Sequence, residues 1–259
     1  MYAEERRRHI ASLAAVDGWV KVGSLAERFA VTSETIRRDL AALDAIGAVH
    51  RVRGGARAAH SYQTSEVPLA DRNRSATEAK LAIATAALDF VPESGTIFIG
   101  AGTTNNSLAE FLGQTERAAN LNIIINSLPG ALSLASYGLD NVQLLGGTVR
   151  GMTQSIVGPT ALRYLALQRA GVAFIGTDAL TVEHGLSTAD TQEAAIKTAF
   201  MTNAEKVVVL CDSSKLGRDY LVSFATIRDI DVLITDSAAP DSLVTAVEKQ
   251  GVNVIVVQR

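Results

Sequence analysis

The chain has 259 residues, of which 47% are hydrophobic and 20% charged, and it carries a net charge of −3 at pH 7. This length holds one large domain or two ordinary ones, and the apolar content excludes a chain that cannot bury a core. No apolar stretch approaches the roughly 20 residues that span a bilayer, and the charged N-terminus lacks a signal sequence. We therefore expect a soluble, cytoplasmic protein with no membrane partner. The single cysteine, Cys211, excludes an internal disulfide bond and a cysteine zinc site.

Charge is distributed unevenly along the chain. Residues 1–74 hold 12 basic and 9 acidic side chains, whereas the remaining residues hold 12 basic and 18 acidic ones. The net charge thus changes from +3 to −6 between the two parts. This change predicts two domains with different partners, and the basic one is the candidate for binding nucleic acid.

Three helical patterns are predicted within the first 50 residues. The first ends at Gly18, and the second covers about residues 22–29. The third covers residues 32–47, because Thr32 or Ser33 can cap its N-terminus and Gly47 can end it. A link of only two residues between the second and third helices is the spacing of a helix-turn-helix. The inward faces are predicted to carry Ile10, Leu13, Ala14, Leu25, Ala26, Phe29, Ile36, Leu40, Leu43 and Ile46.

Polar side chains crowd the N-terminal half of the third helix. A recognition helix uses such residues to reach base edges in the major groove, and Arg37 or Arg38 can pair with guanine. Glu34 either accepts from a cytosine amino group or contacts the helix dipole. An ordinary solvated face would explain the two arginines alone, but together with the turn spacing and a basic hairpin they favour DNA binding. The predicted DNA-binding residues are Thr32, Ser33, Glu34, Thr35, Arg37, Arg38, Arg51 and Arg53.

A hairpin is predicted over AVHRVRGGARAA, residues 48–59, with its tight turn at Gly54 and Gly55. Its arginines, including Arg57, bring positive charge to phosphates or to the minor groove, as the wing of a winged helix does. Asp39 and Asp44 are interpreted either as solubilising residues or as partners of nearby arginines.

Alternating helical and strand patterns follow a polar segment that contains Pro68 and has no clear period. We expect a DNA-binding domain at residues 1–57, a linker at residues 58–75 and a sensor domain at residues 76–259. Short apolar runs rich in β-branched residues occupy residues 96–100, 122–126, 142–146, 172–176, 206–211, 231–235 and 253–257. Because helical patterns separate most of them, we predict a parallel, doubly wound α/β sheet with helices on both faces.

Glycine and polar residues follow five of these predicted strands, where ligands bind in such sheets. Glycines let a backbone approach a phosphate, and Thr103 and Thr104 add hydroxyls at a helix N-terminus. Lys215 adds a point charge, and Asn126 and Ser127 suit sugar hydroxyls. Turns of any α/β protein are rich in the same residue types, but five such strand ends favour a pocket. The predicted effector-binding residues are Gly102, Thr103, Thr104, Asn126, Ser127, Gly146, Gly147, Asp178, Glu193, Lys197 and Lys215.

Several of these residues admit two interpretations. Glu193 and Lys197 share a helix face, as an exposed ion pair or as residues of the pocket mouth. Asp178 is a sugar-hydroxyl acceptor, a turn residue or, in an isomerase, a base assisted by Glu193 or His184. Arg150 is assigned a structural role in preference to ligand contact. We expect neither a cofactor nor a metal ion.

The segment VTSETIRRDLAALDAIGAVHRVRGGA, residues 31–56, closely resembles the DeoR-type winged helix-turn-helix. Downstream, the motifs G-x-G-T-T, L-G-G, E-H-G-L-S-T, E-A-A-x-K and D-S-S-K-x-G resemble the sensor domain of that family. The resemblance implies a fold similar to ribose-5-phosphate isomerase and a sugar-phosphate inducer, with Thr103, Thr104 and Lys215 near the phosphate. Many members carry Asp where this chain has Gly100. An acid at that position can bind a sugar hydroxyl, and Gly100 has no side chain to make this contact.

Further stretches, among them MYAEERRR and VVVLCDSSKLGRDYLVSF, are similar to the actinobacterial SugR/FruR-type regulators of phosphotransferase sugar uptake. This resemblance implies effectors of the fructose 1-phosphate or fructose 6-phosphate class. We expect a repressor, not an enzyme, that acts as a homodimer or homotetramer on a DNA operator. The alternative is an enzyme like the sugar-phosphate isomerases and deaminases.

Overall fold

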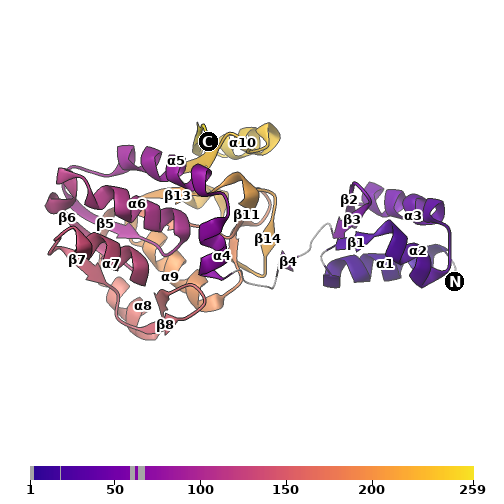
Figure 1. The fold of residues 1–259 in the computed structure, drawn as a ribbon, viewed down its shortest axis with the longest axis horizontal. Coiled ribbons are helices and arrows are strands. Elements are labelled where there is room, and N and C mark those ends of the chain that lie inside the picture. The colour runs from indigo at the N-terminus through magenta and orange to yellow at the C-terminus, as the bar shows by residue number, and fades with distance from the viewer. Residues whose placement is uncertain (1–2, 18, 59–61, 64–67) are drawn as a thin grey trace. The chain divides into compact units, whose positions relative to one another are not determined.

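The computed structural model describes residues 3–17, 19–58, 62–63 and 68–259. The chain divides into two compact units, Met1–Thr64 and Ser65–Arg259 (Figure 1). Gly18, the predicted end of the first helix, lies outside the described residues, as do residues 59–61 and 64–67 of the predicted linker. The described remainder of that linker is not structureless, because it contains the short strand β4 (Tyr62–Gln63) and the helix α4 (Leu69–Arg74).

The first unit contains the three predicted helices, α1 (Ala3–Asp17), α2 (Val22–Phe29) and α3 (Ser33–Ala45). Thr32 caps α3, because its hydroxyl accepts a hydrogen bond from the Thr35 backbone N–H at 3.2 Å. Apolar side chains from all three helices form one core. The prediction for Ile46 is wrong: this residue follows the end of α3 and is 76% exposed, since the chain turns away at Gly47.

A small sheet accompanies these helices. The predicted hairpin is formed by β2 (Val49–Val52) and β3 (Gly55–Ala58), and β3 also pairs with the unpredicted strand β1 (Trp19–Lys21). A Cβ atom on Gly55 would lie 2.0 Å from the carbonyl oxygen of Val20, so only glycine permits this close pairing. The result is a winged helix whose wing is joined to the start of α2.

All seven predicted strands of the second unit form one parallel sheet, which confirms the predicted fold class. Its order is β17-β16-β13-β10-β5-β6-β7. The strands are β5 (Gly95–Ile99), β6 (Leu121–Ile125), β7 (Val142–Leu144), β10 (Ala170–Gly176), β13 (Ala204–Leu210), β16 (Val232–Asp236) and β17 (Asn253–Val257). The chain order runs outward in one direction from β5 and in the other from β10. The topological switch point, where such sheets bind ligands, therefore lies between these two strands.

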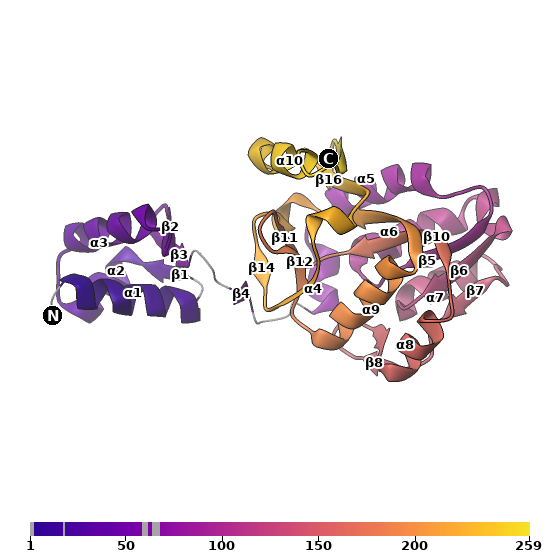
Figure 2. The same ribbon diagram turned by 180° about the vertical axis from the view of Figure 1, so that it is seen from behind.

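Helices cover both faces of this sheet. One face packs against α5 (Thr77–Ala87), α6 (Thr103–Gly113) and α7 (Leu128–Ser136), which are labelled in Figure 1. The other packs against α8 (Pro159–Leu165), α9 (Thr191–Thr202) and α10 (Asp241–Glu248); Figure 2 shows α8 and α9 on this side. In the part of the chain that the structure describes, no helix is long and apolar enough to cross a membrane.

Short strands beyond the central sheet complete the second unit, and none of them was predicted. A hairpin consists of β8 (Thr148–Arg150) and β9 (Ser155–Val157). A second, antiparallel sheet consists of β11 (Ala179–Thr181), β12 (Gly185–Thr188) and β15 (Val222–Ala225). Because β11 follows β10 directly, this sheet lies at the carboxyl end of β10.

Candidate functional site: a switch-point pocket and a recognition helix

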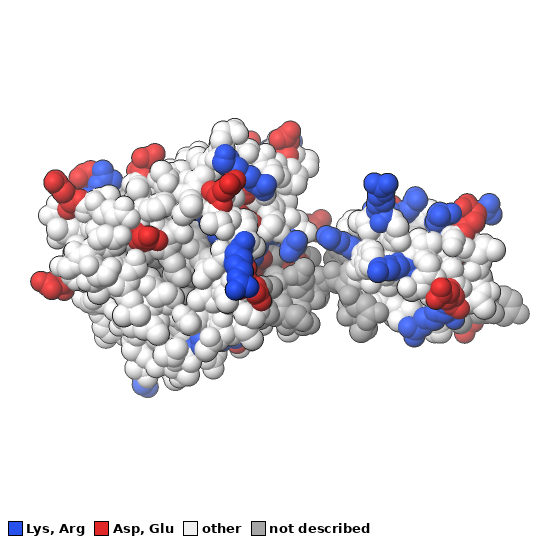
Figure 3. All heavy atoms as spheres, viewed as in Figure 1, with Lys and Arg blue, Asp and Glu red and all other residues white. Residues whose placement is uncertain are grey.

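The predicted DNA-binding residues lie on the accessible surface of the first unit. Thr32, Ser33, Glu34, Arg37 and Arg38 are exposed around the N-terminal half of α3, and Thr35 is half-buried there. Arg51 and Arg53 are exposed on the hairpin. Figure 3 shows basic side chains gathered along this unit.

Contacts within α3 leave its arginines available to a ligand. Glu34 forms ion pairs with Arg37 at 3.4 Å and Arg38 at 3.7 Å, and all three side chains are exposed. Exposed pairs of this kind contribute little stability, so DNA can break them cheaply. The hydroxyls of Thr32 and Thr35 hydrogen-bond to each other at 2.9 Å, so capping is their role in the free protein.

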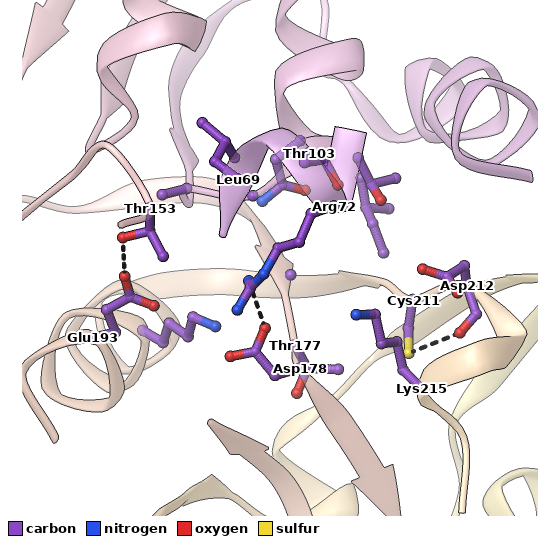
Figure 4. A pocket seen from close by; sticks show the side chains of 17 residues that line it. Leu69, Arg72, Thr103, Thr153, Thr177, Asp178, Glu193, Cys211, Asp212 and Lys215 are labelled. Atoms are coloured by element: carbon purple, nitrogen blue, oxygen red, sulfur yellow. Dashed lines mark hydrogen bonds and ion pairs between the residues drawn. The ribbon is translucent and has the colours of Figure 1, made fainter. Parts of the chain in front are cut away.

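The second unit has a pocket at the switch point between β5 and β10. Its residues come from the carboxyl ends of β5, β10 and β13, the N-terminus of α6, one face of α9, and α4 (Figure 4). The lining residues are Leu69, Arg72, Ala101, Gly102, Thr103, Thr104, Asn105, Thr153, Gly176, Thr177, Asp178, Glu193, Lys197, Leu210, Cys211, Asp212 and Lys215. Seven of the predicted effector-binding residues are thus brought together from four separate parts of the chain.

The loop from β5 into α6 has the geometry of an anion site. Gly102 has φ of 147°, a conformation that favours glycine, and Thr103 and Thr104 begin the helix. The buried Asn105 amide donates to the Gly100 carbonyl at 2.7 Å and to the Phe174 carbonyl at 3.1 Å. Asn105 therefore ties the ends of β5 and β10 together beneath the loop.

Asp178 lies buried at the other side of the switch point. Its carboxylate accepts hydrogen bonds from Arg72 at 2.7 Å and from Thr188 at 2.6 Å. Burial raises the pKa of Asp178, but the charges of Lys197 and Arg72, the hydrogen bond from Thr188 and the charge of Lys215 together outweigh burial, so the pKa lies below its ordinary value. The side chain is therefore an ionised acceptor at neutral pH.

Glu193 and Lys197 are both buried and both line the pocket, so the interpretation as an exposed ion pair is wrong. Glu193 accepts hydrogen bonds from Arg150 at 2.7 Å, Thr153 at 2.5 Å and Ser155 at 2.8 Å. Burial raises the pKa of Glu193, but Lys197 and these hydrogen bonds outweigh it and lower the pKa. Arg150 thus has the structural role that was predicted for it.

Four predicted ligand residues do not line this pocket. The Asn126 side chain accepts from the Ala101 N–H at 2.7 Å and donates to the Ile156 carbonyl at 3.1 Å. Ser127 caps α7 and donates to Asn106. Their polar atoms therefore support neighbouring loops. Gly146 and Gly147 are also absent from the lining, and a Cβ atom on Gly147 would lie 2.5 Å from the Val157 carbonyl oxygen.

Several lining residues were not predicted. Arg72 belongs to the segment that was interpreted as a linker, Thr153 to the β8–β9 turn, and Asp212 caps the short helix that carries Lys215. Cys211 is buried, and burial raises the pKa of its thiol. His184 Nδ1 lies 2.7 Å from a carboxylate oxygen of Asp219, and His184 does not line the pocket, where it would have to lie to assist an isomerase base.

Two family models match the chain. The DeoR-like helix-turn-helix domain matches residues 6–62, and the DeoR C terminal sensor domain matches residues 75–237. The chain belongs to the DeoR family. This DeoR-family chain is 34% identical to the HTH-type transcriptional regulator GlpR of Haloferax volcanii, over 98% of each protein.

A second relative is the lactose phosphotransferase system repressor of Streptococcus mutans. It is 33% identical over 94% of this chain and 96% of the relative. Both relatives are named as a transcriptional regulator or a repressor, and the chain carries the DeoR-like helix-turn-helix domain, so it is a DNA-binding transcriptional regulator. Among solved structures, ribose 5-phosphate isomerase A of Methanocaldococcus jannaschii is 21% identical, covers 55% of each chain and has a TM-score of 0.41.

Proposed function

We propose that this chain is a repressor of sugar uptake or sugar metabolism genes that a sugar phosphate releases from its operator. Residues 1–57 are assigned to DNA binding, residues 58–75 to the connection and residues 76–259 to sensing. The observation that carries this proposal is the switch-point pocket, where threonine hydroxyls, a helix N-terminus and two lysines face two buried carboxylates. Such a site matches a ligand with an anionic end and a hydroxylated end.

We assign the phosphate to the N-terminus of α6. There Gly102 admits a close approach, Thr103 and Thr104 donate hydrogen bonds, and Lys215 supplies positive charge from another loop. The hydroxylated end then lies toward Asp178, Glu193 and Lys197. Ionised carboxylates accept hydrogen bonds from sugar hydroxyls, and these charge-assisted bonds are stronger than neutral ones.

The DNA half of the proposal places α3 in the major groove, with the arginines of the hairpin on phosphates. A homodimer or homotetramer would present two such winged helices to a repeated or palindromic operator. Sugar phosphate binds the state of the oligomer that cannot hold both winged helices in register with the operator. Linkage then requires operator DNA to weaken sugar-phosphate binding by the same factor by which the sugar phosphate weakens operator binding. A coupling of about 1–3 kcal/mol would change operator affinity roughly 5–150-fold.

An enzymatic role is less well supported by the geometry. The Asp178 carboxylate already accepts hydrogen bonds from Arg72 and Thr188, and its lowered pKa makes it a weak proton acceptor. A hydroxyl acceptor fits these contacts better than the base of an aldose–ketose isomerase. Turnover of ribose 5-phosphate or glucosamine 6-phosphate that is abolished by Asp178→Asn would establish the enzyme.

The resemblance to SugR/FruR-type regulators supports fructose 1-phosphate or fructose 6-phosphate as the effector. The test is a thermal-shift screen of sugar phosphates on the full chain, since a ligand of the native state raises its stability. Positive compounds are then titrated into an operator-binding assay, with unphosphorylated fructose as the matched control. The proposal is supported if a phosphorylated sugar releases the protein from DNA and unphosphorylated fructose does not. A screen in which no sugar phosphate alters the stability of the protein or its DNA binding contradicts the proposal.

A further inference from the structure

The helix α4 (Leu69–Arg74) adds nothing to the apolar cores of the chain. None of its six residues is buried, and none belongs to a core cluster. An isolated helix needs about 12–15 residues to be even marginally stable in water. The conformation of α4 therefore depends on the contacts that dock it to the sensor unit.

Those docking contacts are polar. The backbone N–H of Leu69 donates to the Met152 carbonyl at 3.1 Å. The buried Lys80 ammonium donates to the Ser75 carbonyl at 2.6 Å and also to the Arg72 carbonyl. Burial lowers the pKa of Lys80, as do Lys215 and Arg72, against the opposing charge of Asp212. Beyond these backbone contacts, the Arg72 side chain reaches into the pocket and bonds to Asp178.

Arg72 holds an acceptor that the proposed ligand needs. Figure 4 shows its guanidinium between the α6 N-terminus and Asp178, with the dashed line joining it to the carboxylate. The Arg72 side chain is 13% exposed and the Asp178 side chain 4%, so the ion pair is largely desolvated. With Thr188 on the other carboxylate oxygen, Asp178 has both oxygens engaged before any ligand arrives.

We propose that Arg72 is an internal occupant of the sugar end of this pocket, and that a sugar phosphate displaces it from Asp178 and so releases α4. This inference rests on the proposed function. A buried carboxylate that loses a donor is destabilised unless a new donor replaces it. Sugar hydroxyls provide that replacement, whereas inorganic phosphate is an anion that Asp178 repels. Inorganic phosphate therefore occupies the α6 end without releasing α4.

Release of α4 gives the pocket a route to the DNA-binding unit. In chain order, α4 is the first helix of the sensor unit after the segment that connects the two units. Releasing it adds six residues to that connection. A longer tether lowers the effective concentration of a second winged helix at an operator when the first is bound. Loss of this avidity weakens operator binding with no change in α3 itself.

The test measures amide hydrogen exchange of peptides that cover residues 68–76 in the full chain. The probes are fructose 6-phosphate, or another sugar phosphate that stabilises the protein, and inorganic phosphate. In the wild type, the sugar phosphate should accelerate exchange in α4 by about tenfold or more, and inorganic phosphate should not. Arg72→Gln should exchange rapidly without ligand, and Arg74→Gln, which removes an exposed charge from the same helix, should behave as the wild type.

The same variants distinguish displacement from direct ligand contact. In Arg72→Gln the internal competitor for Asp178 is gone, so this variant should bind sugar phosphate as tightly as the wild type or more tightly. The sugar phosphate should no longer change its affinity for the operator. A tenfold weaker affinity in Arg72→Gln, or slower α4 exchange in the wild type with ligand, overturns the inference because Arg72 then clamps the ligand. If no sugar phosphate binds, the proposed function itself fails. Equal rates of α4 exchange in Arg72→Gln and Arg74→Gln would separately overturn the role of Arg72 in docking α4.

Discussion

Asp39 of α3 accepts a hydrogen bond from Arg6 of α1 at 2.6 Å, and the Asp39 side chain is only 2% exposed. Arg7 donates to the second carboxylate oxygen at 3.0 Å. Of the two interpretations of Asp39, pairing with arginines is therefore confirmed. Because Asp39 faces α1 while Arg37 and Arg38 are exposed, this contact orients the face of α3 that we propose to bind DNA.

Replacing Asp39 should destabilise the first unit. Asp39→Ala leaves Arg6 buried without its carboxylate, and removal of one partner of a buried pair costs about 3–5 kcal/mol. The measurement is urea denaturation of the full chain, followed by a signal from Trp19 in the first unit. Glu34→Ala on the same helix is the control, because its exposed pairs should contribute less than about 1 kcal/mol. Equal stability of the two variants would refute the role of Asp39.

The exposed arginines of α3 should determine operator affinity. Arg37→Ala and Arg38→Ala should each weaken operator binding by about 1–3 kcal/mol while sugar-phosphate binding stays unchanged. A variant that loses a phosphate contact should also show a salt dependence shallower by about one unit of slope. Arg28→Ala, at the exposed C-terminal end of α2, is the control. Normal operator affinity in both α3 variants would contradict the recognition-helix assignment.

The central sheet was predictable because each strand is a short run of β-branched apolar residues between helical patterns. The sequence could not predict β12, whose GLST residues are buried but mostly small or polar. It pairs with β11, which precedes it in a hairpin, and with β15, which comes from a distant part of the chain. The predicted hairpin likewise omitted β1, because three residues carry no periodicity that distinguishes them from a loop.

The pocket was predicted in part for a related reason. Strand ends at the switch point, such as those before Gly102 and Asp178, face the ligand space directly. Asn126 follows β6, which is one strand removed from the switch point, and its amide is used by the backbone around it. Arg72 lies 106 residues from Asp178 in sequence, and no local pattern indicates which loop a linker arginine will reach.

Lys215 should be required for binding the anionic end of the ligand. Lys215→Gln removes a positive charge from the pocket lining, and a hydrogen bond to a charged group contributes about 1.5–3 kcal/mol. We therefore expect sugar-phosphate affinity to fall roughly 10–150-fold in calorimetric titration, with little change in operator binding by the ligand-free protein. Lys249→Gln, an exposed lysine just after α10, is the matched control. Unchanged affinity in Lys215→Gln would place the phosphate elsewhere.

The pocket carboxylates should make stability depend on pH in the acid range. Asp178 and Glu193 have pKa values below their ordinary 3.8 and 4.5 in the folded protein. Near those ordinary values the unfolded chain binds more protons, so stability rises with pH there. The contribution of both groups is fully present above the ordinary values and is lost as pH falls through them toward the lowered values.

This acid dependence can be assigned to the two side chains by substitution. Urea denaturation of the ligand-free chain at several pH values between neutral and acid should give a shallower loss of stability for Asp178→Asn and Glu193→Gln than for the wild type. Each group accounts for at most about 1.4 kcal/mol per pH unit. Asp241→Asn, at the exposed start of α10 and outside the pocket lining, should keep the wild-type slope. Identical slopes in all four proteins would show that the pocket carboxylates are not held ionised by Lys197 and its neighbours.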